Sequence, residues 1–125
     1  MRFGRILNQA LAAALAGAGL VASASATAAV DAAGAQMLAR QSGCFKCHAV
    51  DKKKDGPAYR DVAAKYKDKP VAETEAKLIH HITSGERVKF EDGHEEDHKI
   101  VKSKDPVQIK NLVDWIMSLE GGTKP

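Results

Sequence analysis

The chain has 125 residues, 44% of them hydrophobic and 28% charged, with a formal net charge of +3. These values are typical of one small globular domain, and they exclude a collagen-like chain or one that is disordered throughout. Both cysteines lie in one short motif, so the sequence contains no disulfide framework. Aromatic residues make up only 5% of the chain, which suggests that something other than side chains fills part of the interior.

Residues 1–28 have the pattern of a secretory signal peptide. Arg2 and Arg5 form a positive start, an uncharged run follows over residues 11–22, and small residues at its end offer cleavage sites. The alternative is a membrane anchor, but the run is rich in Ala and Gly and short for a bilayer span. We therefore expect an exported, periplasmic protein with a mature domain at residues 29–125 and no transmembrane segment after cleavage.

Charge in the mature domain is uneven rather than large. Loss of the signal peptide removes two arginines and no acidic residue, which leaves a net charge of about +1 and argues against a nucleic-acid partner. Residues 40–69 carry nine basic and four acidic side chains, whereas residues 86–97 carry six acidic and two basic ones. Such a dipolar surface can orient a partner protein in transient electrostatic docking, although ordinary solvated surface explains the same pattern.

We predict four helices and no strand in the mature domain. The predicted helices span residues 32–41, 58–66, 71–84 and 106–119. The last is the clearest, because Asp105 is a favourable N-cap, Pro106 suits the first helical position, and apolar residues then recur at helical spacing up to Leu119. The residues with distinctive chemistry lie mostly in two predicted loops, at 44–57 and 86–104.

Residues 44–48 read Cys-Phe-Lys-Cys-His, which is the Cys-x-x-Cys-His pattern of covalent c-type haem attachment. Two thiols at this spacing can add to the two vinyl groups of one haem, and the adjacent histidine then lies beneath the iron. A zinc site requires more ligands, a thioredoxin-like dithiol requires strands around it, and a disulfide leaves His48 unexplained. We therefore predict one covalent haem c, attached through Cys44 and Cys47, with His48 as the proximal ligand.

Four segments extend this motif: residues 43–51, 56–59, 62–66 and 112–116. Their sequences, GCFKCHAVD, GPAY, VAAKY and LVDWI, resemble those of small bacterial monohaem class I cytochromes c. The resemblance covers nearly the whole mature domain. It implies an all-α class I cytochrome c fold, with three to four helices around the haem and with the first and last helices crossing.

The same resemblance assigns roles to three more residues. It implies that the Pro57 carbonyl accepts a hydrogen bond from His48, which orients the imidazole ring. It also implies that Tyr59 and Trp115 lie near the haem and the helix crossing. Simple packing is the plainer interpretation of these two aromatic side chains.

The sequence departs from this family at the distal iron ligand. Class I cytochromes c normally supply a methionine from the loop before the last helix, and this loop contains none. Met37 lies on the first helix close to the attachment motif, and Met117 lies at the edge of the last apolar stripe, so neither is a good candidate. Imidazole is also a good ligand for haem iron. We predict His98 as the distal ligand by counting back from the last helix, and His94 as the alternative by counting forward from the preceding aromatic residue.

Other interpretations of the histidines stay open. His80 points away from the apolar face of its helix, and His81 lies at the edge of that face as a weaker candidate. Surface histidines and an open or water-bound iron would also fit. Finally, His94 and His98 have the spacing of a separate metal site on a helical turn, among acidic neighbours.

The sequence therefore predicts a periplasmic one-electron carrier with His/His ligation. It is not expected to be an enzyme, because no substrate bond is made or broken. Its expected partners are redox proteins that dock transiently. The alternative is a haem-based sensor of gas, redox state or pH with a labile or open sixth position. A haem-bearing subunit of a dehydrogenase is a third interpretation.

Overall fold

The computed structural model describes residues 17–21 and 29–119. The predicted signal peptide therefore lies almost wholly outside the described residues, and the part at 17–21 has no regular secondary structure. Its cleavage and the domain boundary at residue 29 stay predictions. Over the two described ranges, no helix is both long enough and apolar enough to cross a bilayer.

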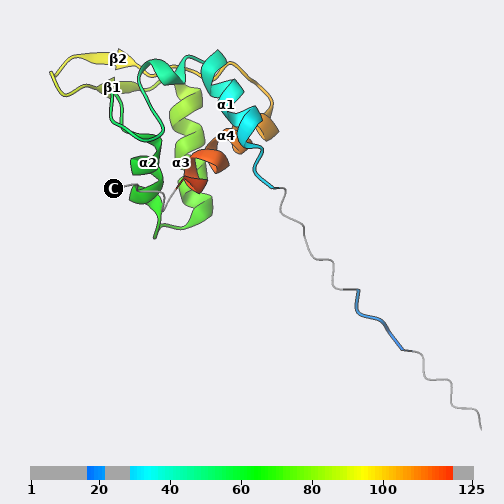
Figure 1. Cartoon of the computed structure of the whole chain (residues 1–125). Coiled ribbons are helices and arrows are strands. Elements are labelled where there is room, and N and C mark those ends of the chain that lie inside the picture. The colour runs from blue at the N-terminus through cyan, green and yellow to red at the C-terminus, as the bar shows by residue number, and fades with distance from the viewer. Residues whose placement is uncertain (1–16, 22–28, 120–125) are drawn as a thin grey trace, which may run out of the picture.

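Four α-helices and a short β-hairpin make up the domain formed by residues 29–119 (Figure 1). The helices are α1 (Ala32–Gln41), α2 (Tyr59–Tyr66), α3 (Val71–Ser84) and α4 (Pro106–Ser118), and a 3₁₀-helix occupies Cys44–Lys46. Each α-helix begins and ends within one residue of its predicted bounds. The predicted, mostly helical architecture is confirmed.

The prediction that the domain contains no strand is wrong. Strands β1 (Arg87–Lys89) and β2 (Glu95–Asp97) pair as an antiparallel hairpin, with Val88 opposite Glu96. Each strand is only three residues long and mostly charged, so the sequence lacks the apolar alternation that indicates a strand. In the connecting turn, Gly93 adopts a φ of 91°, a left-handed conformation that favours glycine.

The core forms where α1 and α2 both pack against α4. The apolar stripe that predicts α4 in the sequence is the face that this helix buries. Alanines dominate the buried face of α1, and such small side chains let two helices approach closely. The buried side chains of the three helices are Ala35, Leu38, Ala39, Tyr59, Ala63, Leu112, Val113, Trp115 and Ile116.

Hydrogen bonds hold the start of α1 on the side of α4. Asp31 caps α1, and its carboxylate accepts a hydrogen bond from the Gly34 N–H at 2.9 Å. The Asn111 side chain accepts from the Asp31 N–H at 2.9 Å and donates to the Asp31 carbonyl at 2.8 Å. Because Asp31 and Asn111 are 80 positions apart, this pair joins the two ends of the domain.

The segment between β2 and α4 is held by both α3 and α1. Gly85 ends α3 with a φ of 67°, and just before it the Ile82 carbonyl accepts from the Val101 N–H at 2.8 Å. The next residue, Lys102, donates its N–H to the Ser42 hydroxyl at 3.0 Å. Two anchors therefore fix the path of the chain around residues 98–102.

Asn111→Ala is expected to lower the free energy of unfolding by about 1–2 kcal/mol, because it removes both bonds to Asp31. Thermal and denaturant unfolding of the haem-loaded protein measure this loss. Val107→Ala is the matched control on the same helix, since Val107 is 74% exposed. Equal stability of the Asn111→Ala and control variants would contradict the role given to this pair.

Candidate functional site

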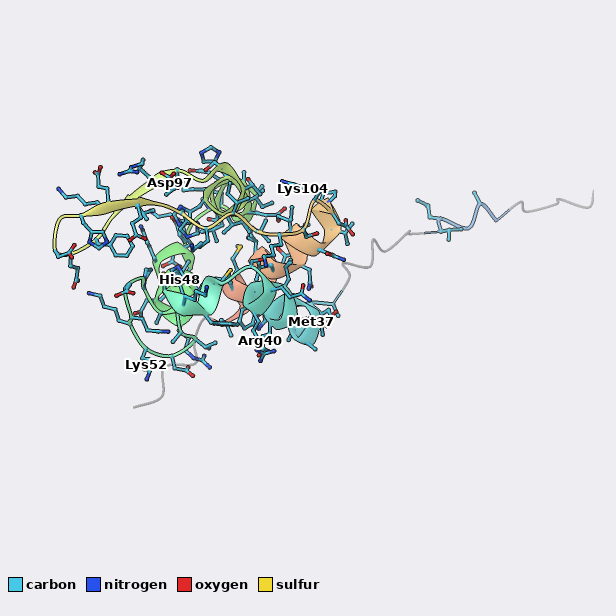
Figure 2. All side chains as sticks on the ribbon, turned by 90° about the horizontal axis from the view of Figure 1, so that it is seen from above. Met37, Arg40, His48, Lys52, Asp97 and Lys104 are labelled. Atoms are coloured by element: carbon cyan, nitrogen blue, oxygen red, sulfur yellow. The ribbon has the colours of Figure 1, made fainter. Side chains whose placement is uncertain are left out.

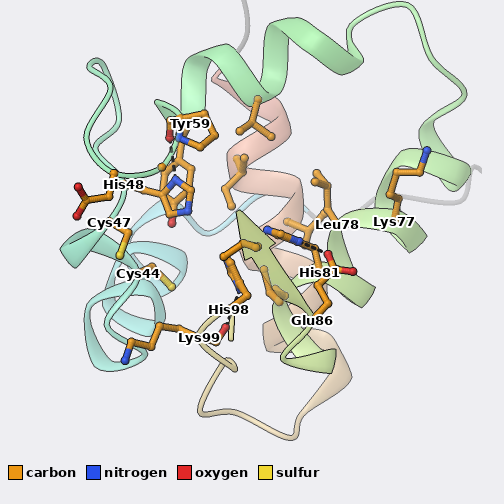
Figure 3. A pocket seen from close by; sticks show the side chains of 18 of the residues that line it. Cys44, Cys47, His48, Tyr59, Lys77, Leu78, His81, Glu86, His98 and Lys99 are labelled. Atoms are coloured by element: carbon orange, nitrogen blue, oxygen red, sulfur yellow. Dashed lines mark hydrogen bonds and ion pairs between the residues drawn. The ribbon is translucent and has the colours of Figure 1, made fainter. Parts of the chain in front are cut away.

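A cavity of about 890 Å³ lies between the 3₁₀-helix, α2, α3 and the hairpin (Figure 3). This volume is within the range of about 300–1,000 Å³ that is typical of cofactor and ligand sites. Cys44, Cys47 and His48 lie on one side of the cavity, and His81 and His98 lie across it. Apolar side chains of α4 complete its lining: Leu112, Val113 and Ile116.

The 3₁₀-helix brings the two thiols to the same side of the cavity. Gly43 precedes it with a φ of 76°, which turns the chain sharply after α1. The Cys44 carbonyl then accepts from the His48 N–H at 3.0 Å, so the whole motif is folded into one compact turn. Neither cysteine is in a disulfide, and burial raises the pKa of the Cys44 thiol.

His48 is oriented by the backbone around it. Its Nδ1 donates to the Pro57 carbonyl at 2.7 Å, the bond that the family resemblance implies. This bond places the proton on Nδ1 and leaves the Nε2 lone pair available to a metal. Gly56 lies against the ring, and a β-carbon there would be 2.6 Å from His48 Cε1. Burial lowers the pKa of His48 and favours the neutral ring.

Two aromatic side chains support His48 from behind. The Tyr59 ring stacks on His48, with 5.0 Å between ring centres and 19° between planes. Trp115 meets Tyr59 edge-on at 5.8 Å. Tyr59 lines the cavity, whereas Trp115 lies behind it in the core and is 4% exposed. Trp115 therefore acts on the cavity through Tyr59.

His98 faces His48 across the cavity. The centres of the two rings are 6.2 Å apart. His98 Nδ1 donates to the Lys99 carbonyl at 2.9 Å, which leaves its Nε2 unprotonated in the neutral ring. Burial, followed by the nearby His81, lowers the pKa of His98, so the neutral ring is favoured here too.

His81, which the sequence pattern places at the edge of the apolar face of α3, lies directly beside His98 in the structure. Its ring centre is 4.0 Å from that of His98, and its Nδ1 is hydrogen-bonded to the Glu86 carboxylate. This bond lowers the pKa of Glu86. His80, by contrast, has a side chain that is 69% exposed, in agreement with the expectation that it is solvated.

His94 lies outside the cavity, at the turn of the hairpin. It bonds to the Asp92 carboxylate, comes within 3.4 Å of Glu96 and stacks on Phe90 with ring centres 4.2 Å apart. The idea that His94 and His98 share a helical turn is wrong, because β2 separates them in an extended conformation. Within the part of the chain that the structure describes, no group of three or more His, Cys, Asp or Glu side chains is arranged so that it could hold a metal ion.

The methionines of the described ranges are also away from the cavity lining. Met37 lies on α1 and is 58% exposed, and Met117 lies on α4, outside the set of residues that line the cavity. Neither observation changes the expectation that these methionines are poor candidates for the distal position.

With this geometry described, comparison with known proteins assigns the family. The model of the Cytochrome c family matches residues 32–120, which is most of the chain. The chain belongs to the cytochrome c family. The predicted class I cytochrome c fold is thereby confirmed, and so is its cofactor, a covalently attached c-type haem.

Individual relatives agree with this assignment. Cytochrome c-551 of Allochromatium vinosum is 36% identical over 83 residues, which are 66% of this chain and 83% of that protein. Cytochrome c-551 of Pseudomonas aeruginosa is 46% identical over 50 residues, 40% of this chain and 46% of that protein. The crystal structure of the class 1 cytochrome MtoD from Sideroxydans lithotrophicus ES-1 has a TM-score of 0.68 and 63% identity, and the match covers 73% of this chain and 98% of that one.

The residues around the cavity fit a haem of this type. Two thiols and an imidazole lie on one side, apolar side chains of α4 face the interior, and a second imidazole lies opposite the first. The cavity is also lined by charged residues of both signs, namely five acidic residues and four lysines. The lysines carry the charge that suits the carboxylates of a haem. These are Lys65, Lys77, Lys89 and Lys99. As a cytochrome c, the protein is a haem-based electron carrier.

The ring of His94 is expected to titrate, with a midpoint above its ordinary value near 6.5. Hydrogen bonding to Asp92 raises the pKa of His94, and Glu96 adds to this effect. The pair therefore stabilises the fold below the raised pKa of His94 and above the lowered pKa of Asp92. The stabilisation is lost as the pH rises through the pKa of His94, and it is also lost as the pH falls through the pKa of Asp92.

NMR titration of the ring protons measures this pKa, and Asp92→Asn is expected to return it toward the ordinary value. The same experiment tests the alternative assignment of the distal ligand. An imidazole bound to iron does not take up a proton near neutral pH, so a His94 ring that fails to titrate would contradict its placement outside the cavity.

Proposed function

We propose that this cytochrome is a periplasmic one-electron carrier and that His48 and His98 would hold the iron of its single haem c. Cys44 and Cys47 attach the haem through thioether bonds. The haem iron, when bound, supplies the redox couple that takes up and releases one electron. The protein holds the two imidazoles in place and keeps water from the haem with the apolar face of α4.

The observation that carries the ligand assignment is the spacing of the two rings. A metal–imidazole bond is about 2 Å long and the ring centre lies about 1 Å further on, so two imidazoles on opposite sides of one metal have centres about 6 Å apart. The 6.2 Å between His48 and His98 fits this distance.

The protonation of both rings supports the same assignment. Each Nδ1 donates to a backbone carbonyl, that of Pro57 for His48 and that of Lys99 for His98. In both rings the Nε2 lone pair is therefore the one left for iron, and burial lowers both pKa values, so protons compete weakly. His94 has neither the position nor this environment.

The periplasmic location rests on the N-terminal part of the sequence. Residues 1–28 have the order of charged, apolar and small residues that directs export. A mature domain of this size that carries electrons between other proteins requires a surface on which those proteins dock.

We place that docking surface beside the attachment turn. A shallow hollow of about 300 Å³ lies there, and its basic lining consists of Arg40, Lys46, Lys99 and Lys102. Gly43 and Lys99 line both this hollow and the haem cavity, so the two adjoin. Figure 2 shows Asp97 of the acidic hairpin on the other side of His48 from Arg40. An acidic face of a redox partner fits this charge distribution.

His98→Ala is expected to open the sixth coordination position. Reduced wild-type protein should show a low-spin spectrum that CO leaves unchanged over minutes, because a held imidazole excludes CO. The variant should be high-spin and bind CO on mixing. His94→Ala is the matched control and should behave as wild type. Prompt CO binding by the wild type would contradict His/His ligation and favour the sensor alternative.

Lys46→Glu and Lys102→Glu are each expected to lower the rate constant for oxidation of the reduced protein by ferricyanide, an anion, by about threefold or more at low salt. Oxidation by the cationic tris(phenanthroline)cobalt(III) should become faster. Stopped-flow measurements over a range of ionic strength test both. Lys104→Glu is the control, since Lys104 lies away from His48 in Figure 2 and does not line the hollow. Equal effects of all three substitutions would contradict this docking surface.

A further inference from the structure

We propose that His81 positions the distal ligand: its ring confines the His98 imidazole, and Glu86 holds both residues in place. This inference rests on the proposed ligation by His98. It assigns to His81 and Glu86 the role of positioning residues, which act on the iron only through His98.

The contact between the two rings is the first observation. The ring centres of His81 and His98 are 4.0 Å apart and the planes are inclined at 45°, so the rings are in van der Waals contact. Both rings line the haem cavity. The His81 ring therefore occupies the space on one side of the His98 imidazole and blocks its rotation toward that side.

Glu86 connects the two histidines. Its side-chain carboxylate accepts a hydrogen bond from His81 Nδ1. Its backbone carbonyl accepts from the His98 N–H at 2.9 Å. One residue therefore fixes the ring of His81 and the backbone of His98 at once. Glu86 directly follows Gly85, the residue that ends α3, so the helix end sets its position.

The backbone on the other side of His98 is fixed as well. Ile100 packs on Gly85, where a β-carbon would be 3.1 Å from Ile100 Cδ1. Val101 bonds to the Ile82 carbonyl at 2.8 Å. The backbone around His98 is thus held by Glu86 on one side and by Ile82 of α3 on the other, and the His81 ring restricts the side-chain torsions of His98.

A role in filling space alone would not require this arrangement. The His81 side chain is 34% exposed, so it is not a core residue, and its partner is a charged group. An apolar side chain would cover His98 but would have no bond to orient it. The hydrogen bond to Glu86 gives the ring one preferred direction, and this is what distinguishes positioning from packing.

The test is the rate at which CO displaces the distal histidine from the reduced, haem-loaded protein. Loss of positioning lets His98 leave the iron more often, so His81→Ala is expected to raise this rate about tenfold or more. Glu86→Ala should raise it too, because His81 loses its anchor, while the backbone carbonyl that bonds to His98 remains. Glu86→Gln keeps an acceptor oxygen and should stay within about threefold of wild type.

The double variant of His81 and Glu86 tests whether they act together. If Glu86 acts on His98 only through His81, the double substitution should raise the rate of CO binding little beyond that of His81→Ala alone. If the two residues act independently, their effects on the rate should multiply. Val71→Ala is the matched control, a residue of the same helix α3 that is 66% exposed. It should leave the rate within about twofold of wild type. The unfolding midpoint of each variant shows whether the effect is local.

The outcomes separate this inference from the proposed function. A rate unchanged by both His81→Ala and Glu86→Ala, with fast CO binding to His98→Ala, would overturn positioning and leave His98 as the ligand. Wild-type protein that binds CO as fast as His98→Ala would overturn the ligation and, with it, the positioning role. Should His81→Ala fold poorly, Glu86→Ala decides the question, because the Glu86 side chain is 41% exposed and not part of the core.

Discussion

The structure depends on keeping two imidazoles apart and facing each other across a cavity large enough for a haem. His48 and His98 come from loops on different sides of that cavity, and their ring centres lie 6.2 Å apart. His48 follows a three-residue 3₁₀-helix and His98 follows the three-residue strand β2, so neither histidine lies within an α-helix. The separation must therefore be imposed by the helices, because flexible loops without such support would close an apolar cavity rather than keep it open.

The crossing of α1 and α4 provides this support for both loops at once. α1 leads directly into the attachment turn, which carries Cys44 and His48. Its last turn is also joined to the distal side, since the Ser42 hydroxyl accepts from the Lys102 N–H at 3.0 Å. The end of α1 thus fixes the proximal motif by covalent continuity and the distal segment by a hydrogen bond. α3 completes the frame through its own bond to Val101.

The polar groups have two separate roles, one inside the cavity and one at the surface. Backbone carbonyls orient the rings of His48 and His98, and burial lowers the pKa of both rings. The Glu86 carboxylate orients the neighbouring ring of His81. At the surface, charge is separated into an acidic hairpin and a basic hollow that adjoins the cavity. Charges near the cavity rim can guide an encounter without being buried, which avoids the cost of removing them from water.

The sequence by itself predicts the haem attachment motif and the helices, whereas the position of the distal histidine depends on the path of the chain in space. The attachment motif lies within five consecutive residues. Helical periodicity, with a clear N-cap for the last helix, predicts the four helices, because these signals arise from neighbours in the chain. Two ways of counting led to His98 and to His94, and only the hairpin decides between their positions: it carries His94 to its turn and brings His98 back to α3. That hairpin has strands of three mostly charged residues, too short for a periodic signal. The contact of His81 with His98 likewise arises from the packing of α3 against a segment that follows it, a tertiary contact that no local pattern contains.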